Sequence, residues 1–158
     1  MSSGQCWLVK SEPYVYSIED LERDGSTMWD GVRNYEARNI MRDRMKVGDP
    51  VLFYHSAVQP PGVAGVARVS SEPYPDPTAL DPDSDYHDPK SDPDEPRWYL
   101  VDVEFVEKFP RLVTLAEIRE RPELAEMTLL KRSRLSVQPV RQEEFDRVRA
   151  MAREDQDR

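Results

Sequence analysis

The segment VLFYHSAVQPPGVAGVARVS, residues 51–70, contains two apolar runs that are separated by a short loop. The first run covers residues 51–56 and the second covers residues 62–70, and both contain the β-branched or aromatic residues that favour strands. Pro60 and Pro61 lie between the runs, and proline has no backbone N–H group to give to a ladder. The segment therefore predicts two strands joined by a loop.

Further strands are predicted on both sides of this segment. CWLVK, residues 6–10, is a short apolar run, and RLSVQPV, residues 134–140, is another strand candidate. A longer strand is expected to begin near Trp98, because side chains of two kinds alternate after it. The two alternating sets are Tyr99, Val101, Val103 and Phe105 on one face and Leu100, Asp102 and Glu104 on the other.

Capping residues predict two helices in the first third of the chain. SIEDLERDG, residues 17–25, has Ser17 as its N-cap and Gly25 as its stop signal. A second helix begins at Asn34 and is expected to end at the turn of residues 48–50. Its apolar face is formed by Ala37, Met41 and Met45.

Two more helices are predicted in the last third, and the complete pattern indicates the fold class. TLAE, residues 114–117, is a capping box that opens a helix ending near Pro122, and EEFDRVRAMA, residues 143–152, is amphipathic. Five or six strands with short helices around them predict an α+β fold with a small, strongly curved sheet. Such a sheet can close on itself and leave a pocket at its mouth.

Length and composition predict one domain. The chain has 158 residues, which is enough to bury a core without a metal or disulfide. We assign residues 5–153 to this domain and residues 154–158 to a C-terminal tail. The lone Cys6 lies in an apolar run and is interpreted as a core residue rather than a reactive thiol. No apolar run has the length of a membrane span and the N-terminus lacks signal-peptide features, so we expect a soluble, cytoplasmic protein without membrane partners.

The net charge of -9 at first argues against a nucleic-acid partner, because binding to phosphates uses Lys and Arg. The charge is not evenly distributed, however. Residues 71–96 contain nine acidic residues against one lysine, whereas residues 131–141 contain four basic residues and no acid. Residues 29–46 add five basic residues against three acids. A basic face on an acidic protein is therefore possible.

The acidic segment, residues 71–96, also contains seven of the fourteen prolines, which excludes a long helix or a central strand there. It could be a disordered linker or an ordered loop of the domain. We predict a loop, because a strand follows at once and Tyr74, Tyr86 and His87 provide side chains that can pack. Most of its carboxylates are expected to be solvated.

Searches for catalytic, metal and cofactor motifs mostly fail. His55, His87 and Cys6 are too few ligands for a His/Cys zinc site, and no phosphate-binding loop, dinucleotide fingerprint or nucleophile elbow occurs. His55 and Ser56 are neighbours on a strand, so their side chains point to opposite faces. We therefore expect no metal and no cofactor, and binding is a better hypothesis than catalysis.

The segment WDGVRNYEARN, residues 29–39, has the side chains that nucleic-acid binding needs. Trp29 offers a flat ring for stacking a base, Asn34 offers a donor and an acceptor, and Arg33 and Arg38 can reach phosphates. The alternative is structural: Trp29 is a core residue, Asn34 only caps the helix, and the arginines lie on a solvated face. Composition alone favours this structural alternative.

Six motifs resemble, in order and spacing, those of the EVE domain family: WLVKSEP, WDGVRNYEARN, VGDPVLFYHS, YPDPT, DPKSDPDEPRWYLVDV and RLSVQPV. The resemblance extends from Cys6 to about Met151. It implies a PUA-like fold, a curved mixed β-barrel of five to six strands with surrounding short helices, which is related to YTH domains. It also implies a non-catalytic reader of modified bases. The ligands implied are 5-methylcytosine or 5-hydroxymethylcytosine in DNA, or a modified base in RNA.

The resemblance also implies where the base binds. Trp29 corresponds to an aromatic wall of a YTH-type cage, and three other segments contribute polar side chains around it. The implied base-binding residues are Lys10, Ser11, Glu12, Trp29, Asn34, Tyr54, His55, Ser56, Ser136, Val137 and Gln138. Arg33, Arg38, Lys131, Arg132 and Arg134 are candidates for phosphate contacts. If Trp29 is a pocket wall, Trp29→Ala is expected to melt within a few degrees of the parent protein and to lose discrimination between modified and unmodified oligonucleotides.

Two alternatives belong to other functional classes. An enzyme that acts on a modified nucleotide would need an acid or a base in the pocket, for which Glu12 and His55 are the only candidates. A protein-interaction module would use the acidic segment as its contact surface for a protein partner.

Overall fold

The computed structural model describes residues 5–154, and its main feature is one mixed six-stranded sheet in the order β2-β7-β4-β3-β1-β8. Its strands are β1 (Cys6–Ser11), β2 (Ser26–Met28), β3 (Pro50–His55), β4 (Gly62–Val69), β7 (Asp102–Thr114) and β8 (Val137–Val140). A second, two-stranded sheet contains β5 (Tyr74–Pro75) and β6 (Tyr99–Leu100). The helices are α1 (Ile18–Asp24), α2 (Tyr35–Asp43), α3 (Leu115–Arg119), α4 (Thr128–Lys131) and α5 (Gln142–Met151), with 3-10 turns η1 (Pro77–Ala79) and η2 (Pro122–Leu124).

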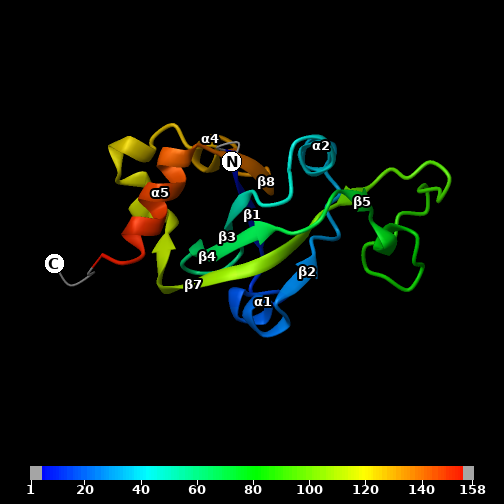
Figure 1. Cartoon of the computed structure of the whole chain (residues 1–158), viewed down its shortest axis with the longest axis horizontal. Helices are drawn as coiled ribbons and strands as arrows, with labels where there is room; N and C mark the ends of the chain where they lie inside the picture. Colours follow the sequence, from blue (N-terminus) through cyan, green and yellow to red (C-terminus); the bar gives the residue numbers. More distant parts are fainter. Residues whose placement is uncertain (1–4, 155–158) are drawn as a thin grey trace.

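The two apolar runs of residues 51–70 form adjacent strands at the centre of the sheet. β3 pairs antiparallel with β4 and parallel with β1, so that Phe53 is paired with Gly65 on one side and with Val9 on the other. Irregular register within the β3–β4 and β4–β7 pairs accompanies a strong curl of the sheet (Figure 1). The sheet curls into a half-barrel whose edges are β2 and β8. The predicted α+β class and curved mixed sheet are confirmed.

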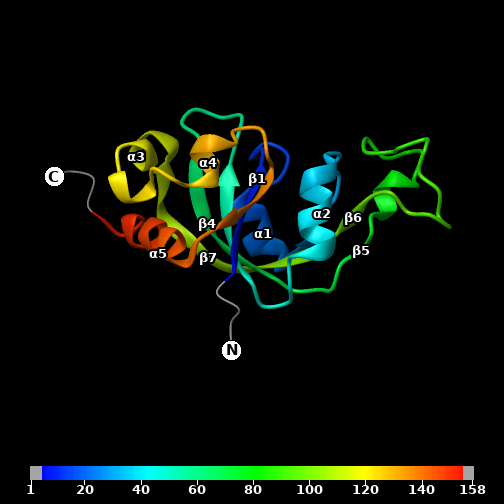
Figure 2. The same cartoon turned by 90° about the horizontal axis from the view of Figure 1, so that it is seen from above.

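Both faces of the sheet are buried, because helices cover each of them (Figure 2). Alternation along β1 sends Trp7 and Val9 to one apolar cluster, together with residues of α1 and α2. Cys6 and Leu8 point to a second cluster, which includes residues of α3, α4 and α5. The central strands are therefore apolar at nearly every position, which explains the continuous apolar runs in the sequence.

Cys6 is fully buried in the second cluster, as predicted. Burial, together with the negative charges of Asp146 and Asp49, raises the pKa of its thiol to about 11. A thiol with this pKa stays protonated at neutral pH, so Cys6 acts as a small core residue.

The predicted helix caps are confirmed, but two element boundaries were wrong. α2 ends at Asp43, and the following chain turns earlier than expected because the Asp49 carboxylate accepts hydrogen bonds from Lys46 N (2.9 Å) and Trp7 Nε1 (2.9 Å). The strand expected from Trp98 is divided into β6 and β7, since Leu100 pairs with Tyr74 in the small sheet. β2 and α4 were missed because three or four residues are too few to show a period.

The acidic segment is an ordered loop, as predicted, and not a linker. Its β5 pairs with β6, and the Tyr74 hydroxyl donates to Asp102 (2.6 Å) while Trp98 Nε1 donates to Asp88 (2.7 Å). The loop projects beyond α2 at one end of the molecule (Figure 1). Most of its carboxylates are exposed, but Asp76 is not: only 2% of it is accessible.

Two predictions concern the chain termini and membranes. Within the predicted tail of residues 154–158, Glu154 accepts a hydrogen bond from Arg121 (2.6 Å), and residues 155–158 lie outside the described residues. Across the described part of the chain, no helix is both long and apolar enough to span a membrane.

Candidate nucleic-acid interface

A cavity of about 770 Å³ opens between the end of β1, residues 27–33, residues 54–57 and the chain before β8. Volumes of this order suit a small organic ligand. Of the predicted base-binding residues, the cavity brings together Lys10, Ser11, Glu12, Trp29, Tyr54, Ser56 and Ser136. Asn34, His55, Val137 and Gln138 do not line it.

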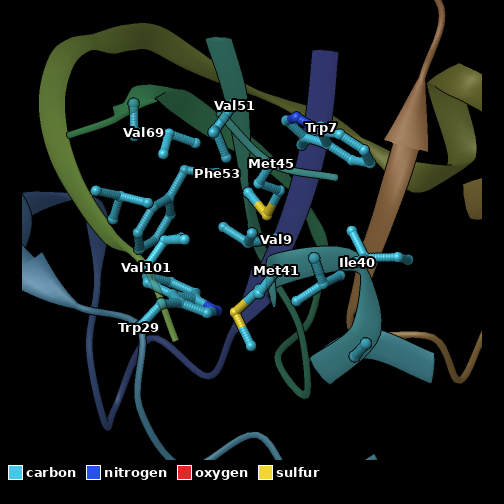
Figure 3. Close-up of a cluster of buried hydrophobic side chains, with 14 of the residues drawn as sticks. Trp7, Val9, Trp29, Ile40, Met41, Met45, Val51, Phe53, Val69 and Val101 are labelled. Carbon is cyan, nitrogen blue, oxygen red and sulfur yellow. The ribbon is translucent and has the colours of Figure 1, made fainter. Parts of the chain in front are cut away.

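Trp29 is at once a wall of the cavity and part of the core. Only 8% of it is exposed, and its ring packs edge-on against Phe53 with the centroids 5.4 Å apart (Figure 3). Met41 and Val101 belong to the same apolar cluster. The backbone is fixed as well, because Trp29 N donates to Val101 O (3.0 Å). The two interpretations of this indole are therefore compatible.

The end of β1 supplies a lysine and a serine that each donate a hydrogen bond within the protein. Lys10 Nζ donates to Ser133 O (2.6 Å) and lies 5.7 Å from the centroid of the Tyr54 ring. Burial lowers the pKa of this ammonium group. Ser11 Oγ donates to Tyr16 O (2.5 Å). These contacts order the polar side of the cavity before any ligand arrives.

Residues 31–33 connect the cavity to the acidic loop. Arg33 Nη1 donates to the buried Asp76 carboxylate (3.1 Å), and Arg33 Nε and Nη2 donate to Tyr86 O (3.1 and 2.5 Å). The Asp76 carboxylate also accepts from Gly31 N (2.9 Å) and from Thr78 N and Oγ1 (2.8 and 2.6 Å). We call this group of residues, Gly31, Arg33, Asp76, Thr78 and Tyr86, the loop clamp.

The loop clamp places an aromatic ring at the rim of the cavity. Tyr86 lines the cavity and packs on Gly31, whose φ of 78° favours glycine. A side-chain carbon at Gly31 would lie 2.8 Å from the Tyr86 ring. Arg33 was predicted to bind phosphate, but its guanidinium group is occupied by Asp76 and Tyr86 and lies 5.4 Å from the Trp98 ring. Arg33 therefore positions the loop.

Asn34 and His55 serve helix ends instead of the cavity. Asn34 is exposed and its Oδ1 accepts from Ala37 N (2.9 Å), which makes it the N-cap of α2. His55 Nε2 accepts from Ile18 N (3.1 Å) at the start of α1. Burial lowers the pKa of His55, although the charge of Glu19 opposes this. A neutral imidazole that accepts from a backbone N–H is a structural group here.

Val137 and Gln138 point into the interior. Val137 belongs to the first apolar cluster, and Gln138 is fully buried with its Nε2 donating to Leu135 O (2.8 Å). Strand alternation accounts for the position of Val137: Ser136 lines the cavity, and the next side chain along the chain turns away from it. Gln138 lies beyond the part of the chain that reaches the rim.

The other predicted phosphate contacts differ in exposure and in partners: Arg38 is partly buried, whereas Lys131, Arg132 and Arg134 are exposed. Arg38 Nη1 donates to Arg97 O (2.7 Å) and its guanidinium group stacks 4.8 Å from the Tyr35 ring. Lys131 pairs with Glu126 and Arg132 pairs with Glu36, each at 2.6 Å. Such exposed pairs contribute about 0–1 kcal/mol, so a phosphate can replace them. Arg134 is exposed and, among the residues that the structure describes, has no acidic partner.

A stack of alternating arginine and aromatic side chains continues from the loop clamp across α2. Arg33 lies over Trp98, Trp98 stacks on Tyr35 with the centroids 4.8 Å apart, and Arg38 lies over Tyr35. Tyr35 is 52% exposed. Exposed aromatic and guanidinium groups are the side chains that contact unpaired bases and phosphates.

Sequence reasoning did not assign Asp30 and Tyr86 to the site, although both line the cavity. Asp30 directly follows Trp29, so the cavity wall extends one residue further than expected. Tyr86 is 57 positions from Trp29 along the chain, and no local pattern connects the two. The YPDPT motif did contain a signal for the role of Asp76, because a carboxylate at the start of a proline turn often accepts hydrogen bonds from backbone N–H groups.

Comparisons with known proteins give one consistent family. The sequence pattern of the EVE domain matches residues 5–151. Thymocyte nuclear protein 1 of Homo sapiens is 43% identical over 161 residues, which cover 90% of this chain and 71% of that protein.

Solved structures agree with this match. The crystal structure of human THYN1 protein in complex with 5-methylcytosine containing DNA has a TM-score of 0.90 and 40% identity, and covers 96% of this chain and 99% of that chain. A hypothetical protein from Leishmania major has a TM-score of 0.91 and 49% identity, with 94% of each chain covered.

Proposed function

The chain belongs to the EVE domain family, and from this membership we propose that it is a non-catalytic reader that binds a modified nucleobase in the Trp29 cavity. The proposed ligand is 5-methylcytosine or 5-hydroxymethylcytosine in DNA. The structure of the human relative with 5-methylcytosine containing DNA supports this choice of polymer and base. Modified RNA is the alternative ligand, and the binding test below includes it.

The cavity itself is the observation that carries the proposal. It combines an indole wall, a second aromatic ring from Tyr86 and polar groups from the β1 end. A base inside a duplex must be extruded to enter such a cavity, at a cost of a few kcal/mol. Stacking contributes about 1–3 kcal/mol per base and roughly offsets this cost. Contacts to phosphate must then supply most of the affinity.

A binding panel at one fixed salt concentration tests the proposal. We expect an oligonucleotide with a single 5-methylcytosine or 5-hydroxymethylcytosine to bind more tightly than its unmodified twin, because the added group fills apolar space beside the aromatic walls. Fluorescence anisotropy gives the affinities, and an RNA series with the same sequence is the control for the polymer. Equal affinity for modified and unmodified oligonucleotides, in DNA and in RNA, would contradict the proposal.

The salt dependence of binding tests the basic rim separately. Ser133 and Ser136 line the cavity, and the exposed Arg134 lies between them in the chain. We expect Arg134→Ala to weaken binding equally for modified and unmodified DNA and to lower the slope of log K against log salt by roughly 0.9. Arg153→Ala, which removes an exposed arginine paired with Glu107 beyond α5, is the matched control. An unchanged slope for Arg134→Ala would show that Arg134 contacts no phosphate.

The enzyme alternative has little support from the site. Glu12 lines the cavity but is exposed and accepts a hydrogen bond from Tyr14, whereas His55 lies at the start of α1. The two candidates for acid and base are therefore not brought together. The protein-partner alternative for the acidic loop also loses force, since this loop supplies Tyr86 to the cavity.

A further inference from the structure

A reader of 5-methylcytosine faces a chemical problem that its methyl pocket cannot solve. Thymine carries the same methyl group at the same ring position, and it is common in DNA. The two bases differ at position 4, where cytosine has an amino group that donates and thymine has a keto oxygen that accepts. A cavity that recognised only the methyl group would bind both bases. Some group in the cavity must therefore recognise the substituent at position 4.

The cavity contains two carboxylates, and they are in different situations. Glu12 is exposed and already accepts a hydrogen bond from the Tyr14 hydroxyl. Asp30 is half-buried, directly follows the Trp29 wall, and accepts no hydrogen bond from any other residue in the described chain. Two charges act on its carboxyl group: Arg33, which is engaged by the loop clamp, and the buried Asp76, which repels it.

In the free protein, the ionised form of Asp30 is disfavoured, because no other residue of the described chain donates a hydrogen bond to its carboxylate. Burial raises the pKa of its carboxyl group, and the charge of Asp76 also raises it, while the Asp30 backbone N–H and the charge of Arg33 oppose this. A half-buried carboxylate that no other residue contacts with a donor lacks most of the hydrogen bonds that compensate for lost hydration. A ligand that brings N–H donors into the cavity would restore them.

The other polar groups of the cavity cannot select the 4-amino group of cytosine over the 4-keto oxygen of thymine. The hydroxyl groups of Ser56 and Ser136 can donate or accept, so they suit an amino group and a keto oxygen equally. Lys10 only donates, and its ammonium group is directed to Ser133 O. Asp30 is thus the one cavity side chain that can only accept when ionised and is not held by another residue of the described chain.

We propose that Asp30 accepts a hydrogen bond from the 4-amino group of the extruded cytosine and excludes thymine, so that it sets base specificity while the aromatic walls sense the 5-substituent. This proposal rests on the function proposed above. Against thymine, Asp30 would place its oxygens next to the 4-keto oxygen, with no hydrogen between the two acceptors. A carboxylate that accepts from the cytosine amino group is a known form of base recognition.

The test compares Asp30→Asn with the parent protein on four duplexes that differ at one position. This position carries 5-methylcytosine, cytosine, thymine or N4,N4-dimethyl-5-methylcytosine opposite an abasic site, so that no base pair has to be opened. We expect the parent to prefer 5-methylcytosine over thymine by about tenfold. The dimethylated base has no N–H donor, and the parent should bind it no better than thymine.

Asp30→Asn should remove the preference against thymine, because its amide can donate to the keto oxygen as well as accept from the amino group. The preference for 5-methylcytosine over cytosine should remain. Asp83→Asn is the matched control, since it removes one exposed carboxylate of the acidic loop that does not line the cavity. It should change all four affinities by the same factor.

The possible outcomes separate this proposal from the proposed function. If the parent does not distinguish 5-methylcytosine from cytosine, the reader function fails, and the thymine comparison still tests Asp30. If Asp30→Asn keeps the preference against thymine, or if the parent binds the dimethylated base as well as 5-methylcytosine, Asp30 does not contact position 4. Binding of the dimethylated base is measured with the parent protein, so this result does not depend on how the variant folds.

Discussion

Trp29→Ala is expected to lower the free energy of unfolding by about 3–5 kcal/mol, which is the usual cost of removing a large buried aromatic side chain. The ring is 8% exposed, packs edge-on against Phe53 and belongs to the cluster that joins α2 to the sheet. Its removal would leave a cavity among Met41, Phe53 and Val101 (Figure 3). Urea denaturation monitored by circular dichroism measures the change.

This expectation corrects the prediction that Trp29→Ala would melt within a few degrees of the parent. That prediction treated the pocket wall and the core as exclusive alternatives, whereas the indole takes part in both. Trp29→Phe is the informative companion variant, because it retains a smaller ring against Phe53 and part of the stacking surface. We expect it to lose less stability and to keep part of the affinity for modified DNA. Parent-like stability of Trp29→Ala would show that the ring is not a core residue.

Local features of the sequence were sufficient to predict most of the elements. Ser17 and Thr114 form capping boxes as expected, because the groups that satisfy each helix end lie three residues apart in the chain. The central strands were equally clear, since burial on both faces leaves uninterrupted apolar runs. The α+β class follows from these local units.

Only part of the cavity lining could be predicted from the sequence, because the rest depends on contacts between segments that are far apart in the chain. Periodicity cannot show that Tyr86 packs on Gly31, or that Arg33 turns to Asp76 instead of to solvent. The sequence therefore predicted a phosphate contact for Arg33, and could not show that its guanidinium group donates to Asp76 and Tyr86. Asn34 illustrates the same limit, since a good cap and a good base contact have the same side chain.

The acidic loop has a role that its composition did not indicate. Its net charge of -8 predicts repulsion from DNA, yet one of its carboxylates is the buried centre of the loop clamp. Asp76 and Arg33 neutralise each other, so the loop can lie beside the cavity without an uncompensated buried charge. The remaining exposed carboxylates should weaken non-specific attraction to phosphate and make binding depend more on the base in the cavity.

Asp76→Ala is expected to lower the free energy of unfolding by about 3 kcal/mol, because removing one member of a buried ion pair leaves the other without its partner. The Arg33 side chain is 25% exposed, which places the expected effect at the lower end of the range for such pairs. Gly31 N and both Thr78 donors also lose their acceptor. Chemical denaturation measures the stability. Asp94→Ala, an exposed carboxylate in the same loop, is the charge-matched control and should change it by less than about 0.5 kcal/mol.

The same variant should loosen the cavity rim and change the response to acid. Without Asp76, hydrogen exchange should become faster at Gly31 and Thr78, and affinity should fall for every base because Tyr86 is no longer held. Burial alone would raise the pKa of Asp76, but hydrogen bonds from Thr78, Gly31 and Arg33 outweigh it and hold the pKa below its ordinary value of 3.8. The stabilisation is therefore complete above that value and is lost as pH falls through the lower folded-state pKa. The stability difference between parent and Asp76→Ala should be constant near neutral pH and shrink below about pH 4. A difference that persists unchanged in strong acid would show that the ionised carboxylate does not hold the loop clamp.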